Sequence, residues 1–141
     1  MNQTSVSAEL SIQVIPPASF ATILLVEKED VVRDSRRLVL SRVHPVVQVV
    51  EDAAGVFNLA PDARFWLIVI DMSDARAAER IAFYARRRWP QAKILLMGPN
   101  CAQMDDALYD DRVEPAGNPA ALLEAGRRLF KSATADIFQS A

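Results

Sequence analysis

Several charged residues stand directly after short apolar runs, where a fold could gather them into one polar site. These residues are Glu27, Lys28, Glu29, Asp71 and Glu114. Met97 and Gly98 occupy the same kind of position after another run. Carboxylates that share a pocket attract cations, and an ammonium group among them neutralises part of their charge. The first question is therefore which elements position these residues.

Four nearly continuous apolar runs have the length and composition of strands buried on both faces of a parallel sheet. They lie at 21–26, 46–50, 65–70 and 94–97, and a weaker run lies at 112–113. Between them, helical patterns extend over 30–43, 52–59, 74–89, 101–109 and 118–131. Asp30, Asp52, Asp74 and Asn118 have the residue types that cap such helices.

The order of these segments is strand then helix, five times over, which predicts a parallel sheet with helices on both faces. Ligand sites in such sheets form beyond the carboxyl ends of the strands. Glu27, Lys28, Asp71, Met97 and Glu114 all fall at that edge. We therefore expect an acidic pocket there, formed by Glu27 and Glu29 together with Lys28.

The residues at the strand ends resemble those of the response-regulator receiver (CheY-like) family. Residues 23–29 resemble its first strand, which ends in acids, and 66–71 resemble its third, which ends in the phosphoacceptor aspartate. Residues 93–98 resemble the fourth strand, and 113–115 resemble the Lys-Pro pair after the fifth. The resemblance covers about 21–131.

The resemblance implies a flavodoxin-like α/β fold with a five-stranded parallel sheet in the order 2-1-3-4-5. Residues 1–20 then form an N-terminal extension, interpreted either as disordered or as an extra edge strand through Ser11–Ile15. Residues 21–131 form the receiver-like domain, and 132–141 form a C-terminal tail.

The chemistry implied by the resemblance is transfer of a phosphoryl group from a kinase histidine to Asp71. It requires Mg²⁺ as cofactor, and the matching positions for its ligands are Glu27, Asp71 and a backbone carbonyl at Ser73. In the family, a hydroxyl residue and a lysine then bind the phosphoryl oxygens. Here these switch positions are altered to Met97 and Glu114.

Lys28 stands where the family has a second metal-binding acid, and its ammonium group would repel Mg²⁺. The total charge of the site equals that of an intact receiver, as if one positive charge had moved from the fifth strand to the first. We therefore hypothesise that Lys28 occupies the place of the metal and pairs with Glu27 and Asp71.

Other sequence features offer less chemistry. The chain has one cysteine, Cys101, and one histidine, His44, which are far apart in sequence. We interpret Cys101 as a buried or idle cysteine and His44 as a loop residue. Only four glycines are present, with no G-x-G-x-x-G or G-x-x-x-x-G-K loop. Arg36-Arg37 and Arg86–Arg88 are interpreted as helix-surface and helix-end charges. We predict no enzymatic activity; a small flavodoxin-like enzyme is the distant alternative.

The composition is that of an ordinary globular domain of 141 residues, with 51% hydrophobic and 24% charged residues. A formal net charge of -2 argues against nucleic acid as the partner. No run is long enough to span a membrane, and the N-terminus does not have the pattern of a signal peptide. We therefore expect a cytoplasmic protein that binds neither membrane nor nucleic acid.

We expect a stand-alone receiver-like signalling module of a two-component phosphorelay, or a fragment of a longer protein. The favoured mode is a pseudo-receiver that acts by protein–protein interaction, with weak or no Mg²⁺-dependent phosphorylation. The alternative is a functional response regulator phosphorylated at Asp71 by a sensor histidine kinase. Expected partners are such a kinase, another signalling protein, or a second copy bound through the last helices and the fifth strand.

Overall fold

A computed structural model describes residues 22–99, 101–114 and 118–140 of the chain. The expected edge strand at Ser11–Ile15 and the predicted Pro115 position lie outside these residues. None of the helices in the described ranges combines the length and the hydropathy needed to cross a bilayer.

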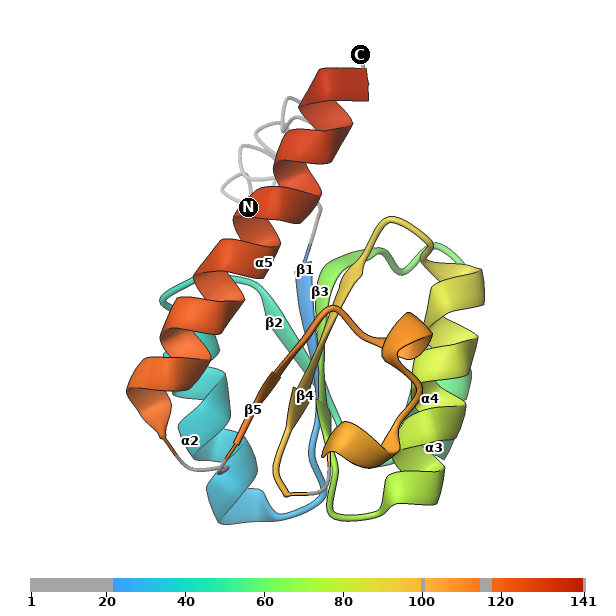
Figure 1. Ribbon diagram of the computed structural model, residues 1–141, viewed down its shortest axis with the longest axis vertical. Helices are drawn as coiled ribbons and strands as arrows, with labels where there is room; N and C mark the ends of the chain where they lie inside the picture. The colour runs from blue at the N-terminus through green and yellow to red at the C-terminus, as the bar shows by residue number, and fades with distance from the viewer. Residues whose placement is uncertain (1–21, 100, 115–117, 141) are drawn as a thin grey trace, which may run out of the picture.

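A five-stranded sheet forms the centre of the domain (Figure 1). Its strands are β1 (Thr22–Val26), β2 (Val47–Val50), β3 (Phe65–Asp71), β4 (Lys93–Met97) and β5 (Asp111–Val113). They lie in the order β2-β1-β3-β4-β5, and every neighbouring pair is parallel. The predicted fold class and strand order are therefore confirmed.

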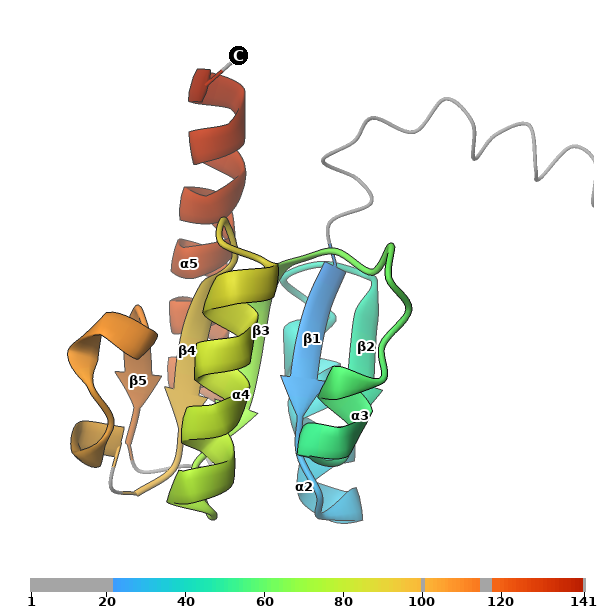
Figure 2. The same ribbon diagram turned by 90° about the vertical axis from the view of Figure 1, so that its right-hand side faces the viewer.

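Helices cover both faces of the sheet. They are α2 (Asp30–Leu40), α3 (Ala53–Phe57), α4 (Ala75–Arg88) and α5 (Pro119–Ser140). The helices α2 and α5 pack together on one face, whereas α3 and α4 pack on the other. Figure 2 views the molecule from the side of α3 and α4.

Alternation along the strands divides the core into two clusters. In β3, Leu67 and Val69 pack beneath α2 and α5, whereas Ile68 and Ile70 pack beneath α3 and α4. The side chains of these four residues are fully buried. Because successive residues of a strand point to opposite faces, a continuous apolar run is what a sheet covered on both faces requires.

Three of the expected helix caps are present. The carboxylate of Asp52 accepts a hydrogen bond from the Gly55 N–H, and that of Asp74 accepts one from the Ala77 N–H. Asn118 Oδ1 accepts from the first turn of α5. Asp30, by contrast, is the first residue of α2 rather than its cap, and it pairs with Arg33 one turn later.

Two segments differ from the expectation. The predicted helix at 101–109 is replaced by two short 3₁₀ helices, Cys101–Gln103 and Asp106–Leu108. Asp105 separates them because its side chain accepts from the Ala107 N–H, a local bond that starts a new turn instead of continuing the old one.

The last helix is longer than expected, since α5 continues from Pro119 through the predicted tail to Ser140. Ala133, two residues past the expected end of the helix, is fully buried. The helix therefore extends past Lys131, and it projects beyond the ends of the strands (Figure 1; Figure 2).

Candidate functional site

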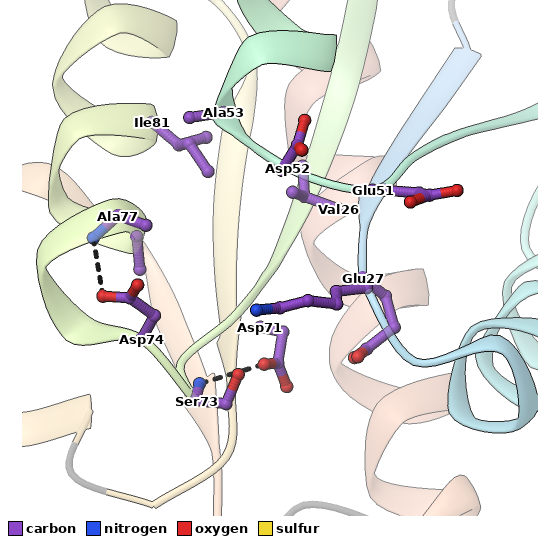
Figure 3. Close-up of a pocket in the computed structure, with 12 residues that line it drawn as sticks. Val26, Glu27, Glu51, Asp52, Ala53, Asp71, Ser73, Asp74, Ala77 and Ile81 are labelled. Atoms are coloured by element: carbon purple, nitrogen blue, oxygen red, sulfur yellow. Dashed lines mark hydrogen bonds between the residues drawn. The ribbon is translucent and has the colours of Figure 1, made fainter.

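Strand register places Glu27 next to Asp71. In the β1–β3 pairing, Val26 lies beside Ile70, so the following residue of each segment lies at the same point of the sheet edge. Both residues continue the alternation that turns every second side chain towards α2 and α5. Figure 3 shows the two carboxylates at this edge, with Ser73 beyond Asp71.

The cation between these carboxylates is Arg36 of α2. Its Nη1 atom lies 2.5 Å from Glu27 Oε1 and 3.0 Å from Asp71 Oδ1. The side chains are 7% exposed for Arg36, 4% for Glu27 and 17% for Asp71. One buried guanidinium nitrogen therefore bridges the ends of β1 and β3 from the helix that covers them.

The remaining carboxylate oxygens also have donors. Glu27 Oε2 accepts from the backbone N–H of Glu29 at 3.1 Å, and Asp71 Oδ2 accepts from the backbone N–H of Ser73 at 2.9 Å. All four oxygens of the pair are thus hydrogen-bonded within the chain. Buried polar groups that are fully satisfied in this way hold a single arrangement.

The two carboxyl groups have shifted pKa values of opposite direction. Burial raises the pKa of Glu27, and the neighbouring Asp71 charge adds to the rise, against the Glu29 N–H and Arg36. For Asp71, burial is outweighed by hydrogen bonds from Ser73 and by Arg36, so its pKa is lowered. Asp71 is therefore the more strongly ionised member of the pair.

A hollow of about 540 Å³ opens beside the pair. It is lined by Glu27, Lys28, Glu29, Val32, Arg36, Asp71, Ser73 and Asp74. The three residues predicted to form an acidic pocket, Glu27, Lys28 and Glu29, therefore line one hollow, together with Arg36.

The hypothesis that Lys28 pairs with Glu27 and Asp71 is wrong, because Arg36 makes both contacts. Lys28 is exposed and forms no ion pair with either residue. Glu27 faces α2, the helix that carries Arg36. Lys28 lies beyond the end of β1 at Val26 and lines the hollow beside the pair without an ion pair to either carboxylate. Lys28 also lines a second hollow, of about 100 Å³, on the side of α3 and α4.

The altered switch positions do not join the pair. Met97 is buried in the cluster beneath α2 and α5. Glu114 turns to the neighbouring loop, where its Oε2 accepts from the Cys101 N–H at 2.9 Å. Gly98 lies between these positions and has φ of 121°, a left-handed conformation that side chains rarely adopt.

Cys101 and His44 fit the interpretations given above. Cys101 is buried. Its burial, and to a lesser extent the nearby Glu114 carboxylate, raise the pKa of its thiol to about 11. His44 lies in the connection between α2 and β2, where its Nδ1 accepts from the Val46 N–H.

Sequence reasoning missed Arg36, which was taken for a surface charge with Arg37. A signal was present, because Arg36 falls on the stripe of α2 that contains Val32, Val39 and Leu40, whereas Arg37 does not. A charged residue on the buried face of an amphipathic helix needs a partner of opposite charge. Two acids at the sheet edge were the nearest candidates.

No family model matches the sequence, and no curated protein matches it. Solved structures share its fold. A CheY-like response regulator receiver domain from Methanospirillum hungatei JF-1 has a TM-score of 0.71 at 16% identity, covering 82% of this chain and 98% of the other. The chemotaxis response regulator CheY4 of Vibrio cholerae has a TM-score of 0.65 at 22% identity, covering 77% and 98%.

A third match is the signal receiver domain of an HD domain-containing protein from Pseudomonas fluorescens Pf-5. Its TM-score is 0.71 at 15% identity, and the match covers 87% of this chain and 96% of that domain. These identities are low, so the comparisons establish the receiver fold of the chain and leave its activity to be argued from the site.

Proposed function

We propose that this chain, which has the receiver fold, is a signalling module that acts through protein contacts without Mg²⁺-dependent phosphorylation of Asp71. The observation that carries the proposal is the buried Arg36 guanidinium between Glu27 and Asp71. In this interpretation, an internal cation replaces the metal ion and the site is held in one state.

The donor set does not fit a magnesium ion. Mg²⁺ demands octahedral oxygen ligands at about 2.0–2.1 Å and loses its waters reluctantly. Here the acidic oxygens that face each other both accept from the Arg36 guanidinium. In the described ranges, no group of three or more His, Cys, Asp or Glu side chains is arranged to hold a metal ion.

The two altered switch positions supply no group that would stabilise a phosphoryl group on Asp71. Met97 has no hydrogen to donate, and the Glu114 carboxylate is directed at Cys101 rather than at the site. Freeing Asp71 Oδ1 for attack would break its bond to Arg36. Charge-assisted bonds of this kind are stronger than neutral ones, so the ground state resists the reaction.

Incubation with acetyl phosphate and Mg²⁺, followed by intact-mass measurement, tests the proposal directly. We expect no gain of a phosphoryl group by the unmodified chain, while a receiver known to accept phosphate gains one in parallel. A gain that disappears in Asp71→Ala would overturn the proposal and establish the phosphorylated response regulator in its place.

That alternative has one observation in its favour. Asp71 keeps a partly exposed carboxylate with a lowered pKa, which is the ionised form that a phosphoacceptor needs. Titration with Mg²⁺ and beryllofluoride separates the two functions, because saturable binding by the unmodified chain supports the alternative. The proposed function predicts binding only after Arg36 is removed.

Arg36→Ala and the neighbouring Arg37→Ala form the matched pair for this titration. Arg36 is buried against both carboxylates, whereas Arg37 is exposed. We expect Arg36→Ala to bind Mg²⁺ measurably by calorimetry and Arg37→Ala to behave like the unmodified chain. Equal Mg²⁺ binding by all three proteins would show that Arg36 does not take the place of the metal.

We further propose signalling proteins as the partners, a sensor histidine kinase among them. A second copy bound through α5 and β5 remains part of this proposal, with sedimentation velocity as its test. The helix expected to contribute to that face is replaced by the two 3₁₀ helices, which reduces the surface available to such a dimer.

A further inference from the structure

The outer face of α4 carries a row of arginines around one exposed aromatic residue. Arg76, Arg80, Phe83 and Arg87 follow one another at intervals of four, three and four residues, which places them on one stripe of the helix. All four are exposed, and the Phe83 side chain is 55% exposed. Figure 2 is viewed from the side of α4.

This row lies opposite the buried stripe of the same helix. Ala78, Ile81, Ala82 and Ala85 are the buried residues of α4 and pack against the sheet. Since 3.6 residues make one turn, the arginine row points directly away from them, over a length of about 16 Å. In the described part of the chain, Arg80 contacts the Phe57 ring on α3, and the row is otherwise turned away from the packed side of α4.

The three arginines of the row have no carboxylate partner in the part of the chain that the structure describes. The other two arginines of α4 are engaged: Arg86 pairs with Asp110, and Arg88 donates to the Leu59 and Ala60 carbonyls. In the row, Arg87 lies 5.7 Å from the centre of the Phe83 ring, and Arg80 lies 5.7 Å from that of Phe57 on α3.

Helix electrostatics do not account for the row. Cations favour the last turn of a helix, which explains Arg87, but Arg76 is the second residue of α4, where the dipole disfavours a cation. Arg76 and Arg80 are also like charges one turn apart, a slightly destabilising arrangement. Arg76 and Arg80 are therefore unfavourable for α4, in a chain whose formal net charge is -2.

We infer that this row is a docking surface for an acidic amphipathic segment of a protein partner. Guanidinium groups bind carboxylates in a bidentate manner, and a row at helical spacing matches Asp or Glu at the same spacing. Phe83 supplies the apolar contact at its centre, and exposed aromatic and arginine residues are the types that anchor protein interfaces. The surface is separate from the Arg36 site and does not depend on the state of Asp71.

Other anionic ligands fit the row less well. An anionic bilayer binds helices whose apolar face is broad, whereas this row has one aromatic residue between charged neighbours. Duplex nucleic acid is bound by extensive basic faces, and the remaining surface of this acidic chain would repel it. An acidic protein segment, by contrast, can bind to the row without contacting the rest of the surface.

Fluorescence anisotropy tests the inference with a synthetic helical peptide that carries Glu at the spacing of the row and Leu opposite Phe83. We expect saturable binding to the full chain that weakens as salt is raised from about 50 to 200 mM. Arg76→Gln/Arg80→Gln/Arg87→Gln should weaken binding at least about tenfold. The control Arg37→Gln/Arg42→Gln/Arg127→Gln removes the same charge from exposed positions and should change binding less than about twofold.

A second pair of variants tests the contribution of the Phe83 ring to peptide binding. Phe83→Ala should weaken peptide binding by about fivefold or more, while Leu38→Ala, which truncates a 59% exposed side chain on α2, should leave it unchanged. Equal losses in the two arginine triples would reduce the effect to net charge and overturn the inference.

Three further outcomes also overturn it. They are the absence of peptide binding by the unmodified chain, row-dependent binding to phosphatidylglycerol vesicles or duplex DNA in place of the peptide, and row-dependent self-association in sedimentation velocity. Circular dichroism of each variant checks that α4 is intact, so that a loss of binding reports on the surface rather than on folding.

Discussion

Arginine serves two different purposes on the two faces of the sheet. On the side of α2, Arg36 is buried, and its guanidinium is bonded to two carboxylates. On the outside of α4, Arg76, Arg80 and Arg87 are exposed and have no carboxylate partner among the described residues. A buried charge is tolerated only with a complete set of partners, whereas an exposed one contributes little to folding. We therefore expect that replacing Arg36 destabilises the fold, whereas replacing the exposed arginines of α4 weakens binding of a partner.

The largest effect is expected at the buried end of this comparison. Arg36→Ala leaves Glu27 and Asp71 facing each other without a cation, so the free energy of unfolding should fall by about 3 kcal/mol. Urea unfolding of the variant measures the loss, and Arg37→Ala should stay within about 0.5 kcal/mol of the unmodified chain. If the two variants were equally stable, the buried ion pair would not form in solution, and the comparison would fail.

Two adjacent arginines of α4 sharpen the comparison within one helix. Arg88 donates to two backbone carbonyls and to the Tyr84 hydroxyl, and it lies 4.7 Å from the centre of the Trp89 ring. Arg88→Ala should therefore lower the free energy of unfolding by about 2 kcal/mol. Arg87→Ala, measured beside it by thermal and urea unfolding, should have an effect close to zero, and a larger loss at Arg87 than at Arg88 would contradict the assignment.

The contribution of Asp71 to stability should depend on pH. Because the pKa of Asp71 is lowered in the folded chain, its ionised form stabilises the fold above the ordinary carboxyl pKa of 3.8, and this contribution is lost as pH falls through the lowered value. Asp71→Asn should thus lower the free energy of unfolding by about 1 kcal/mol at neutral pH, with a difference that shrinks below pH 3.8. A difference independent of pH would mean that the charge of Asp71 is not involved.

Glu27 should show the opposite pH dependence. Its pKa is raised above the ordinary value of 4.5, so the folded chain binds more protons than the unfolded one just above that pH. The free energy of unfolding should therefore decrease as pH rises through this interval, and the decrease should be absent in Glu27→Gln. Urea unfolding at closely spaced pH values measures both slopes in the same experiment.

The smallest effect is expected on the exposed row. Replacing Arg76, Arg80 and Arg87 by Gln should change the free energy of unfolding by less than about 0.5 kcal/mol, because all three side chains are exposed and Arg76 and Arg80 are like charges one turn apart. Urea unfolding at low and high salt measures the difference. A loss above about 2 kcal/mol would mean that the row stabilises α4, and the inference of a docking surface would lose its main support.

The fold was predictable because its signals are local. Four of the five strands are apolar runs that need no partner to be recognised, and Asp52, Asp74 and Asn118 mark helix starts by bonds to nearby backbone groups. The length of α5 and the two 3₁₀ helices before β5 were not predictable in this way. They depend on the packing of the surrounding elements, which no local pattern of residues records.

The sequence alone determined that Glu27 and Asp71 would follow neighbouring strands, since strand order and run length place both at the carboxyl edge of the sheet. It also indicated that a cation within the chain would neutralise them. Which cation does so was decided by tertiary structure. Lys28, adjacent in sequence to Glu27, lines the same hollow without an ion pair to either carboxylate, whereas Arg36, nine residues later, is carried over the sheet edge by the packing of α2. Side-chain direction depends on the face that each element buries, and that face exists only after the helix and the sheet have come together.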